Sequence, residues 1–299
     1  MTGTGLHKSD LAVSARGVRV VRHQSPRMRF EIAFAEPDAF LRRYVRGYVG
    51  GSGWAAASVR RRELPSGNVP LIIGFGTAVR VRRAGATERW DEHTTFAAGL
   101  HDAHTMAESS GSGEGIQVDF TALGARLFYD RPLDDLANRS VELSDILGPA
   151  AGLLVEELFN APSWVARFTI LDRAIGARIR EAGGPAQAVT RAWQELSRTG
   201  GRVRIQELVG EIGWSERHFA TQFRAQFGLS PKAFARVLRF GRAVRALTTS
   251  RGSTLSDVAL DCGYFDQAHF TRDFGDFAGV TPLELLKERL PAEAGFSAV

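Results

Sequence analysis

The feature that most constrains this chain is an internal repeat between Ile205 and Pro282. Apolar residues follow the i, i+3, i+4, i+7 spacing of a helix with one buried face, until a Gly-Trp pair breaks the pattern. Fifty residues later the spacing returns, and a Gly-Tyr pair takes the place of the Gly-Trp pair. The apolar positions are Ile205, Leu208, Val209 and Ile212, then Leu255, Val258, Ala259 and Cys262. A duplicated supersecondary unit accounts for this pattern.

Each copy continues into a second helix. Ser215 is a good N-cap for the first of these, and both copies close on Gly-x-Ser/Thr-Pro. A tight turn between two helices sets them at roughly 90–120°, so that one face of the second helix packs and the other projects. The aromatic residues expected in the core are Trp214, Phe219, Phe223, Phe227, Phe270 and Phe274.

The projecting faces carry side chains that suit DNA. They are Glu216, Arg217, Ala220, Thr221 and Arg224 in the first copy, and Gln267, Ala268, Thr271, Arg272 and Gly275 in the second. Arg, Gln and Thr match the donors and acceptors on base edges in the major groove, and small Ala and Gly allow close approach. The alternative for each of these residues is a solvated helix face.

One helix, Pro231–Thr248, is expected to link the two copies. Its inward positions are apolar, and Arg recurs every third residue at Arg236, Arg239, Arg242 and Arg245. We expect this cationic strip to form internal ion pairs rather than to contact DNA.

The stretch SERHFATQFRAQFGLSPKAFARVLRFGRAVRAL, followed by LSDVALDCGYFDQAHFTRDFGDFAGVTP, resembles the DNA-binding domain of the AraC/XylS family of bacterial transcription regulators. The resemblance covers residues 185–290 and includes an earlier helix, Gln187–Thr199. It implies a seven-helix domain whose two recognition helices enter successive major grooves, about 34 Å apart. It places the base-reading positions at Arg217, Ala220 and Thr221, then at Gln267, Ala268 and Arg272.

The two copies differ in charge. Residues 202–249 hold nine Lys and Arg against three Glu, a net charge of +6, whereas residues 251–299 hold four against eight Asp and Glu, a net charge of −4. Neutralisation of phosphates supplies most non-specific affinity for DNA. We therefore expect the first copy to be the main DNA anchor and the second to contribute weakly.

The front of the chain has a different pattern, with short extended segments separated by Gly, Pro and Asn. Expected strands are 29–34, 58–63, 69–75, 78–82, 94–98 and 116–120, and a helix is expected to start at Pro37 and carry Phe40, Leu41, Tyr44, Val45 and Tyr48. Regular short strands favour a small barrel or sandwich. Helical spacing returns after Ser144, with Ser163 as an N-cap, until Gly183-Gly184-Pro185 ends it.

The expected fold is therefore α+β with two domains. Residues 1–27 are expected to be a disordered or loosely attached arm, 28–143 a β-rich, barrel or cupin-like domain, 144–184 a helical connector, 185–290 the DNA-binding domain and 291–299 a tail. Residues 28–143 resemble, more weakly, the domains that sense small molecules or dimerise in this family.

The composition limits the class of protein and its expected location in the cell. The single cysteine excludes an intrachain disulfide, and no window approaches the roughly 18 apolar residues of a membrane span. The N-terminus lacks the apolar segment of a secretory signal, so a cytoplasmic location is expected. A net charge of +5 is compatible with a nucleic-acid partner.

A competing hypothesis is a metal-dependent, cupin-like enzyme or small-molecule-binding protein with a helical appendage. His101 and His104, with His93 and Glu108, are suitable metal ligands, but residues i and i+3 of a strand point to opposite faces. The aromatic set Trp54, Phe75, Trp90, Phe96 and Phe120 suits either a barrel core or an apolar ligand pocket. No phosphate loop or catalytic motif stands out.

The leading hypothesis is a sequence-specific transcription factor of AraC type, without enzymatic activity or a cofactor. Its partners would be double-stranded operator or promoter DNA and a small-molecule effector, with RNA polymerase and a second copy of the chain as further candidates. The identity of the effector and the operator, and the choice between activation and repression, do not follow from the sequence.

Overall fold

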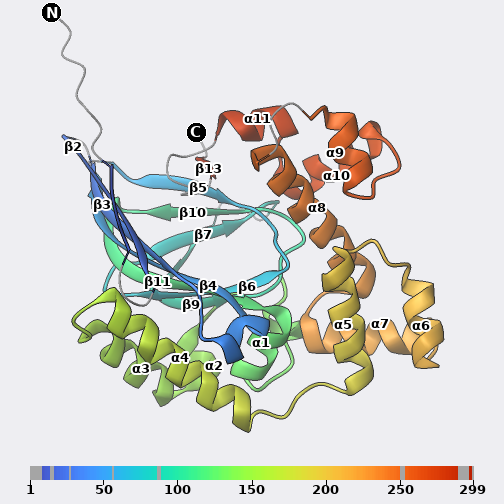
Figure 1. Cartoon of the computed structure of the whole chain (residues 1–299), viewed down its shortest axis with the longest axis horizontal. Coiled ribbons are helices and arrows are strands. Elements are labelled where there is room, and N and C mark those ends of the chain that lie inside the picture. The colour runs from blue at the N-terminus through green and yellow to red at the C-terminus, as the bar shows by residue number, and fades with distance from the viewer. Residues whose placement is uncertain are drawn as a thin grey trace, which may run out of the picture.

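The computed structural model describes residues 9–13, 17–26, 28–55, 57–85, 89–249, 253–288 and 296–297. The front half is β-rich and the rear half is helical, which confirms the α+β class (Figure 1). Two antiparallel sheets lie one above the other in Figure 1, with strand orders β1-β2-β3-β4-β11-β6-β9-β12 and β13-β5-β10-β7-β8. In the described residues these strands form two separate sheets rather than one closed barrel.

The strands of the larger sheet are β1 (Ser9–Val13), β2 (Arg19–Ser25), β3 (Met28–Ala35), β4 (Val45–Ala55), β6 (Asn68–Gly74), β9 (Thr95–Ala98), β11 (Ser112–Thr121) and β12 (Ser140–Glu142). Those of the smaller sheet are β5 (Val59–Glu63), β7 (Val79–Arg83), β8 (Asp91–His93), β10 (Thr105–Ser109) and β13 (Phe296–Ser297). All six expected strands are present, within a few residues at their ends.

Both chain ends join these sheets. In the segment expected as an arm, β1 pairs with β2 and β2 with β3, so its described residues belong to the larger sheet. Residues 1–8, 14–16 and 27 of that segment lie outside the described residues. In the expected tail, β13 pairs with β5.

The helix expected from Pro37 to Tyr48 is wrong. A short 3-10 helix, Ala39–Arg43, is followed by strand β4. A bulge causes the misleading spacing, because Phe120 pairs with Val45 and Asp119 with Gly47, so that Arg46 is the extra residue. Val45 and Tyr48 are consequently both buried although they lie three residues apart in a strand.

Four helices follow or interrupt the sheets: α1 (Ala122–Phe128), α2 (Leu143–Leu147), α3 (Pro149–Phe159) and α4 (Trp164–Glu181). The expected cap of α4 is confirmed, since Ser163 Oγ accepts a hydrogen bond from the Ala166 amide at 3.2 Å. Helix α4 is fixed to the larger sheet where Tyr48 Oη donates to Asp172 Oδ1 at 2.7 Å. A side chain at Gly50 would collide with the Trp164 ring, so this close approach requires glycine.

The described residues from Gln187 to Lys287 form seven helices: α5 (Gln187–Thr199), α6 (Ile205–Ile212), α7 (Glu216–Phe227), α8 (Pro231–Thr249), α9 (Leu255–Asp261), α10 (Gln267–Ala278) and α11 (Pro282–Lys287). They lie beside the sheets, with α5–α7 and α9–α11 at opposite ends of α8 (Figure 1). None of the helices in the described residues has both the length and the apolar character that a membrane span requires.

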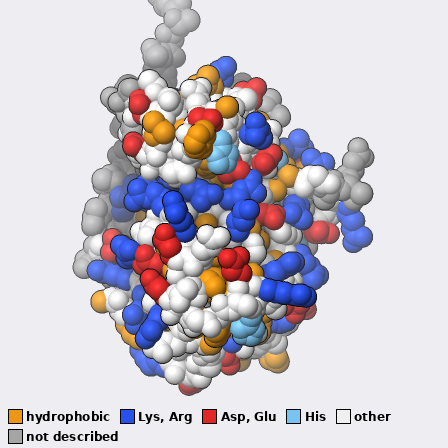
Figure 2. All heavy atoms as spheres, turned by 90° about the vertical axis from the view of Figure 1, so that its right-hand side faces the viewer, with side chains coloured by type: hydrophobic (Ala, Val, Ile, Leu, Met, Phe, Trp, Pro, Cys, Tyr) orange, Lys and Arg blue, Asp and Glu red, His pale blue; other side chains and the backbone are white. Residues whose placement is uncertain are grey.

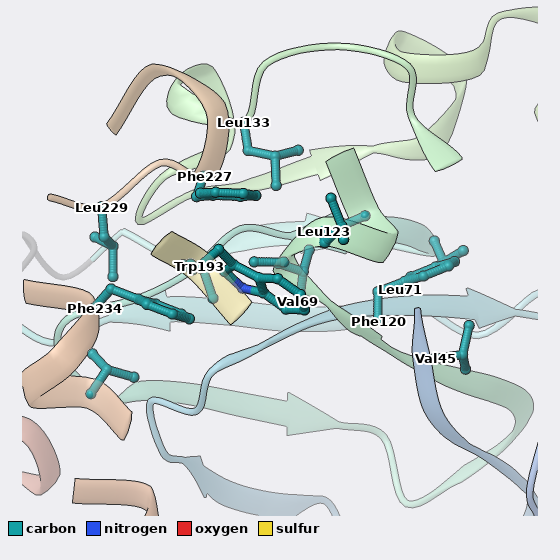
Figure 3. Packing of buried hydrophobic residues seen from close by; sticks show 14 of the residues in the cluster. Val45, Val69, Leu71, Phe120, Leu123, Leu133, Trp193, Phe227, Leu229 and Phe234 are labelled. Atoms are coloured by element: carbon teal, nitrogen blue, oxygen red, sulfur yellow. The ribbon is translucent and has the colours of Figure 1, made fainter. Parts of the chain in front are cut away.

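One hydrophobic core runs through both halves of the molecule. Figure 3 shows Trp193 of α5 and Phe227 of α7 beside Val69, Leu123 and Leu133 of the front half. Phe227 is fully buried and Trp193 is 6% exposed. The Gly-Gly-Pro segment at 183–185 therefore separates two patterns in the sequence without separating two cores.

Candidate DNA-binding face

The first helical pair has the expected turn and cap. Gly213 ends α6 with a φ of 74°, a conformation that favours glycine. Ser215 Oγ then accepts a hydrogen bond from the His218 amide at 3.2 Å and starts α7. Phe219 and Phe223 are fully buried, which confirms them as core, whereas Trp214 is only half-buried.

The second pair repeats this construction with different caps. Gly263 takes a φ of 85° after α9, and Asp266 accepts from the His269 amide at 2.7 Å to start α10. Thr254 and Asp257 form a capping box at the start of α9. Phe270 and Phe274 are fully buried. The repeat in the sequence is therefore a repeat in the structure, and α7 and α10 occupy the positions expected of the two recognition helices.

The residues expected to read DNA lie on open faces of these helices. On α7, Glu216, Arg217, Thr221 and Arg224 are exposed and Ala220 is half-buried. On α10, Gln267, Ala268 and Arg272 are exposed and Thr271 and Gly275 are half-buried. Gln267, Ala268, Thr271 and Arg272 together line a shallow hollow. We refer to these two sets as the α7 face and the α10 face.

The arginines of these faces are available to a ligand. In the part of the chain that the structure describes, Arg217, Arg224 and Arg272 form no ion pair. The Thr221 hydroxyl donates to the Arg217 carbonyl oxygen at 2.9 Å, which leaves its methyl group and lone pairs outward. Guanidinium groups that are held by no carboxylate can bind phosphate or a guanine edge.

The arginines of α8 behave differently. Arg236 forms an ion pair with Asp273 of α10, a carboxylate that is only 5% exposed. Arg239 donates to the Gly201 carbonyl oxygen at 2.8 Å, and Arg242 donates to the Asp261 carbonyl oxygen at 3.1 Å. Three of the four arginines of the strip thus fasten α8 to its neighbours, but in the described residues only Arg236 does so through the expected ion pair. The 19 residues of α8, about 28 Å of helix, hold the two pairs apart.

Positive charge gathers on the side of the molecule that carries α5–α11. Figure 2 shows Lys and Arg side chains in a band across the middle of this side, with acidic side chains above and below it.

Sequence reasoning missed two contacts from the front half onto the ends of the recognition helices. Arg126 Nε of α1 donates to Gln226 Oε1 near the end of α7 at 2.8 Å. Arg62 Nη1 of β5 donates to the carbonyl oxygen of Ala278, the last residue of α10, at 2.9 Å. The partners are 100 and 216 residues apart, so no local pattern in the sequence could have indicated these contacts.

In the described residues, His93, His101 and His104 do not come together as a metal site. No group of three metal-ligating side chains comes together in the described residues. His93 Nδ1 lies 2.9 Å from Glu142 Oε1, whereas His101 Nδ1 lies 3.4 Å from Thr105 Oγ1 and the His104 ring packs against Gly279. The metal-dependent alternative therefore lacks the ligand set on which it depended.

The five aromatic residues that suited either a barrel core or a ligand pocket are divided between core and surface. Phe96 and Phe120 are buried, whereas Trp54 is 50% exposed and Trp90 is approached by three arginines. Phe75 lines a groove of about 550 Å³ between α3 and the neighbouring ends of β6 and β9. These residues do not line one common pocket.

His101 should make the stability of the chain depend on pH. Burial lowers the pKa of His101 to about 4, so below pH 6.5 the unfolded chain takes up a proton that the folded chain excludes. Between pH 6.5 and pH 4 we expect this group to remove about 2 kcal/mol of stability, less than the full shift because the ring is partly exposed. Urea unfolding of wild type and His101→Gln at both pH values measures the difference, and equal losses in both proteins would contradict it.

Comparison with known proteins agrees with this geometry in part of the chain. Residues 208–288 match the family described as "Helix-turn-helix domain", and residues 34–142 match "Domain of unknown function (DUF6597)". An uncharacterized HTH-type transcriptional regulator of Staphylococcus aureus is 32% identical over 85 residues, which are 28% of this chain and 11% of that protein. The matched region thus spans about a tenth of the length of the curated relatives.

Solved structures to which this chain is similar include a probable AraC family transcriptional regulator from Rhodopseudomonas palustris. It is 30% identical, with 36% of this chain and 100% of that chain covered and a TM-score of 0.32. ToxT from Vibrio cholerae is 10% identical, with 87% of this chain and 98% of that chain covered and a TM-score of 0.46.

Proposed function

We propose that this chain, whose C-terminal part is an AraC-type helix-turn-helix domain, is a transcription regulator that binds specific double-stranded DNA through the α7 and α10 faces. The observation that carries the proposal is the pair of equivalent recognition helices, each with a buried Phe stripe on one side and an open polar face on the other. Two helices of this kind at the ends of α8 suit two segments of major groove on one side of a duplex.

The proposed reading residues are Glu216, Arg217, Ala220, Thr221, Arg224, Gln267, Ala268, Thr271 and Arg272. Arg217 and Arg272 are the proposed donors to base edges or phosphates, because both are exposed and held by no carboxylate in the described residues. Small Ala220 and Ala268 would let the two helices approach the groove floor.

The front half would then regulate this binding. We propose that the β-rich region, 28–143, senses a small-molecule effector or mediates pairing with a second copy of the chain. The region 144–184 would serve as connector and 185–290 as the DNA-binding domain. We assign the chain no catalytic reaction and no cofactor. We place the protein in the cytoplasm, where it would meet DNA and RNA polymerase.

Selection of DNA from a random-sequence pool tests the proposal. The full chain is incubated with duplexes that contain a random central segment, and bound duplexes are sequenced after several rounds. We expect enrichment of a sequence with two conserved blocks about one helical turn apart, and an affinity that falls steeply with salt concentration. Recovery of unrelated sequences with no shared block would reject sequence-specific binding.

A further inference from the structure

The two helical pairs are attached to the front half by different chemistry. At the first pair the attachment is mainly apolar, since Phe227 and Leu229 join the core that contains Leu133, and Gly228 lies against the Leu133 carbonyl. At the second pair it is polar and centred on one side chain, Arg62 of β5. Polar contacts of this kind separate at lower cost than a continuous apolar core.

Arg62 binds the ends of two helices at once. Its Nη1 donates to the Ala278 carbonyl oxygen at 2.9 Å, its Nε to Glu288 Oε2 at 3.0 Å and its Nη2 to Glu288 Oε1 at 3.4 Å. Ala278 ends α10, and Glu288 follows the last residue of α11. The Arg62 side chain is only 11% exposed and that of Glu288 18%, so solvent screens this pair weakly.

The position of Arg62 suits the end of a helix. The last carbonyl groups of a helix have no partner within it, and a cation there also interacts favourably with the helix dipole. A backbone bond strengthens the same junction, because the His104 amide donates to the Phe277 carbonyl oxygen at 2.8 Å. We call this junction of Arg62, His104, Phe277, Ala278 and Glu288 the β5–α10 latch.

Charge complementarity explains why this attachment forms. The second pair lies in a segment with a net charge of −4, which is poorly suited to anchoring on phosphates. The strand that holds it is rich in arginine, with the sequence VRRRE in β5. Among the acidic residues of this segment, Glu288 pairs with Arg62 of the smaller sheet, whereas Asp273 and Asp276 pair with Arg236 of α8.

We propose that Arg62 is a positioning residue for the second recognition helix. The latch holds only the C-terminal end of α10, whereas Gln267, Ala268, Thr271 and Arg272 lie in its first half and stay open. The end of α7 is held in a comparable way by Arg126 through Gln226. The front half thus acts together with α8 to fix where the α10 face stands relative to the α7 face. This inference rests on the proposed function, because positioning matters only if both faces read one DNA molecule.

The first test needs no DNA. Hydrogen–deuterium exchange is measured on the full chain for wild type, Arg62→Ala and Glu288→Gln, with Arg60→Ala as the matched control. Arg60 lies on the same strand, is 48% exposed and pairs with Glu108, away from α10. We expect amides of α10 and α11 to exchange about tenfold faster in the two latch variants, with α7 unchanged. Unchanged exchange in α10, or an equal rise in α7, would overturn the latch.

The second test measures positioning on DNA. A duplex selected from a random pool by the wild-type chain is altered by inserting one base pair between its two conserved blocks. We expect the insertion to weaken wild type and Arg60→Ala about tenfold, and Arg62→Ala less than threefold, because a released α10 can follow the displaced block. Arg62→Lys, which keeps the charge, should recover part of the wild-type sensitivity.

The two tests separate the two claims. If no duplex is enriched, the proposed function fails and the positioning role falls with it, while the exchange experiment still decides whether the latch exists. If a duplex is enriched and Arg62→Ala responds to the insertion as wild type does, the DNA-binding function stands and the positioning role is rejected.

Discussion

Replacing Arg217 with alanine should weaken binding to the selected duplex by about 1–3 kcal/mol, whereas Arg272→Ala should cost less than half as much. Arg217 is exposed on α7, within a segment whose net charge is +6. Arg272 shares α10 with Asp276, whose side chain is 63% exposed, and its segment has a net charge of −4. Carboxylates beside a phosphate contact oppose it, so the first pair should provide most of the affinity.

Fluorescence anisotropy titrations at several salt concentrations measure both variants. Arg173→Ala is the matched control, because Arg173 lies on α4 and pairs with Glu157, far along the chain from either recognition helix. The salt dependence should become shallower in Arg217→Ala if this side chain neutralises a phosphate. Equal losses for Arg217→Ala and Arg272→Ala would contradict the ranking of the two pairs.

The largest expected effect on stability comes from Phe227→Ala, which should lower the free energy of unfolding by about 3–5 kcal/mol. Phe227 is fully buried, with ring centroids 5.0 Å from Phe223 and 6.1 Å from Trp193. Because the core around it continues into the front half, the cavity should destabilise strands and helices together. Urea unfolding followed by far-ultraviolet circular dichroism, and by tryptophan fluorescence, should show one shared transition at a lower midpoint.

Phe265→Ala provides the control for Phe227→Ala. Phe265 is 86% exposed, so its removal should change stability by less than about 0.5 kcal/mol. If urea unfolding showed two separate transitions and Phe227→Ala shifted only one of them, the two halves would unfold independently. That result would contradict a shared core.

The helical half could be predicted closely from the sequence because its signals are local. Helix α6 spans Ile205–Ile212, as the spacing of apolar residues indicated, and α5 spans Gln187–Thr199, as the family resemblance implied. Ser215 caps α7 as expected. A cap, an apolar stripe and a closing glycine all act within a few residues of one another, so a single sequence contains the information that places them.

The front half was harder to predict, because strand pairing is not local. The bulge at Arg46 changes which side chains of β4 point into the core, so the buried residues on either side of it have the spacing of a helix. Strand β10 contains Met106 and Glu108 between flanking strands, and its pairing with β5 and β7 depends on residues more than twenty positions away. Its sequence, TMAES, has no strong preference for a strand.

In the candidate site, too, local features could be predicted from the sequence and long-range contacts could not. The composition of the α7 and α10 faces could be read from the repeat, because side chains at helical spacing share a face whatever surrounds them. The β5–α10 latch could not be predicted from the sequence, because Arg62 in VRRRE is one of three adjacent arginines. Only the packed structure shows that it is Arg62 that reaches Ala278 and Glu288. Contacts of this kind depend on how complete elements dock.

The continuous core also limits how such a chain can be recombined. A chimera that joined residues 1–184 to the helices of a relative would place foreign side chains against Val69, Leu123 and Leu133, where Trp193 and Phe227 now fit. Close packing tolerates changes of volume poorly, so an unmatched graft would leave voids or clashes at that seam. Substitutions at this interface in one half therefore require matching substitutions in the other half. The Gly-Gly-Pro segment at 183–185 is a change of pattern in the sequence, but it is a poor junction for a chimera.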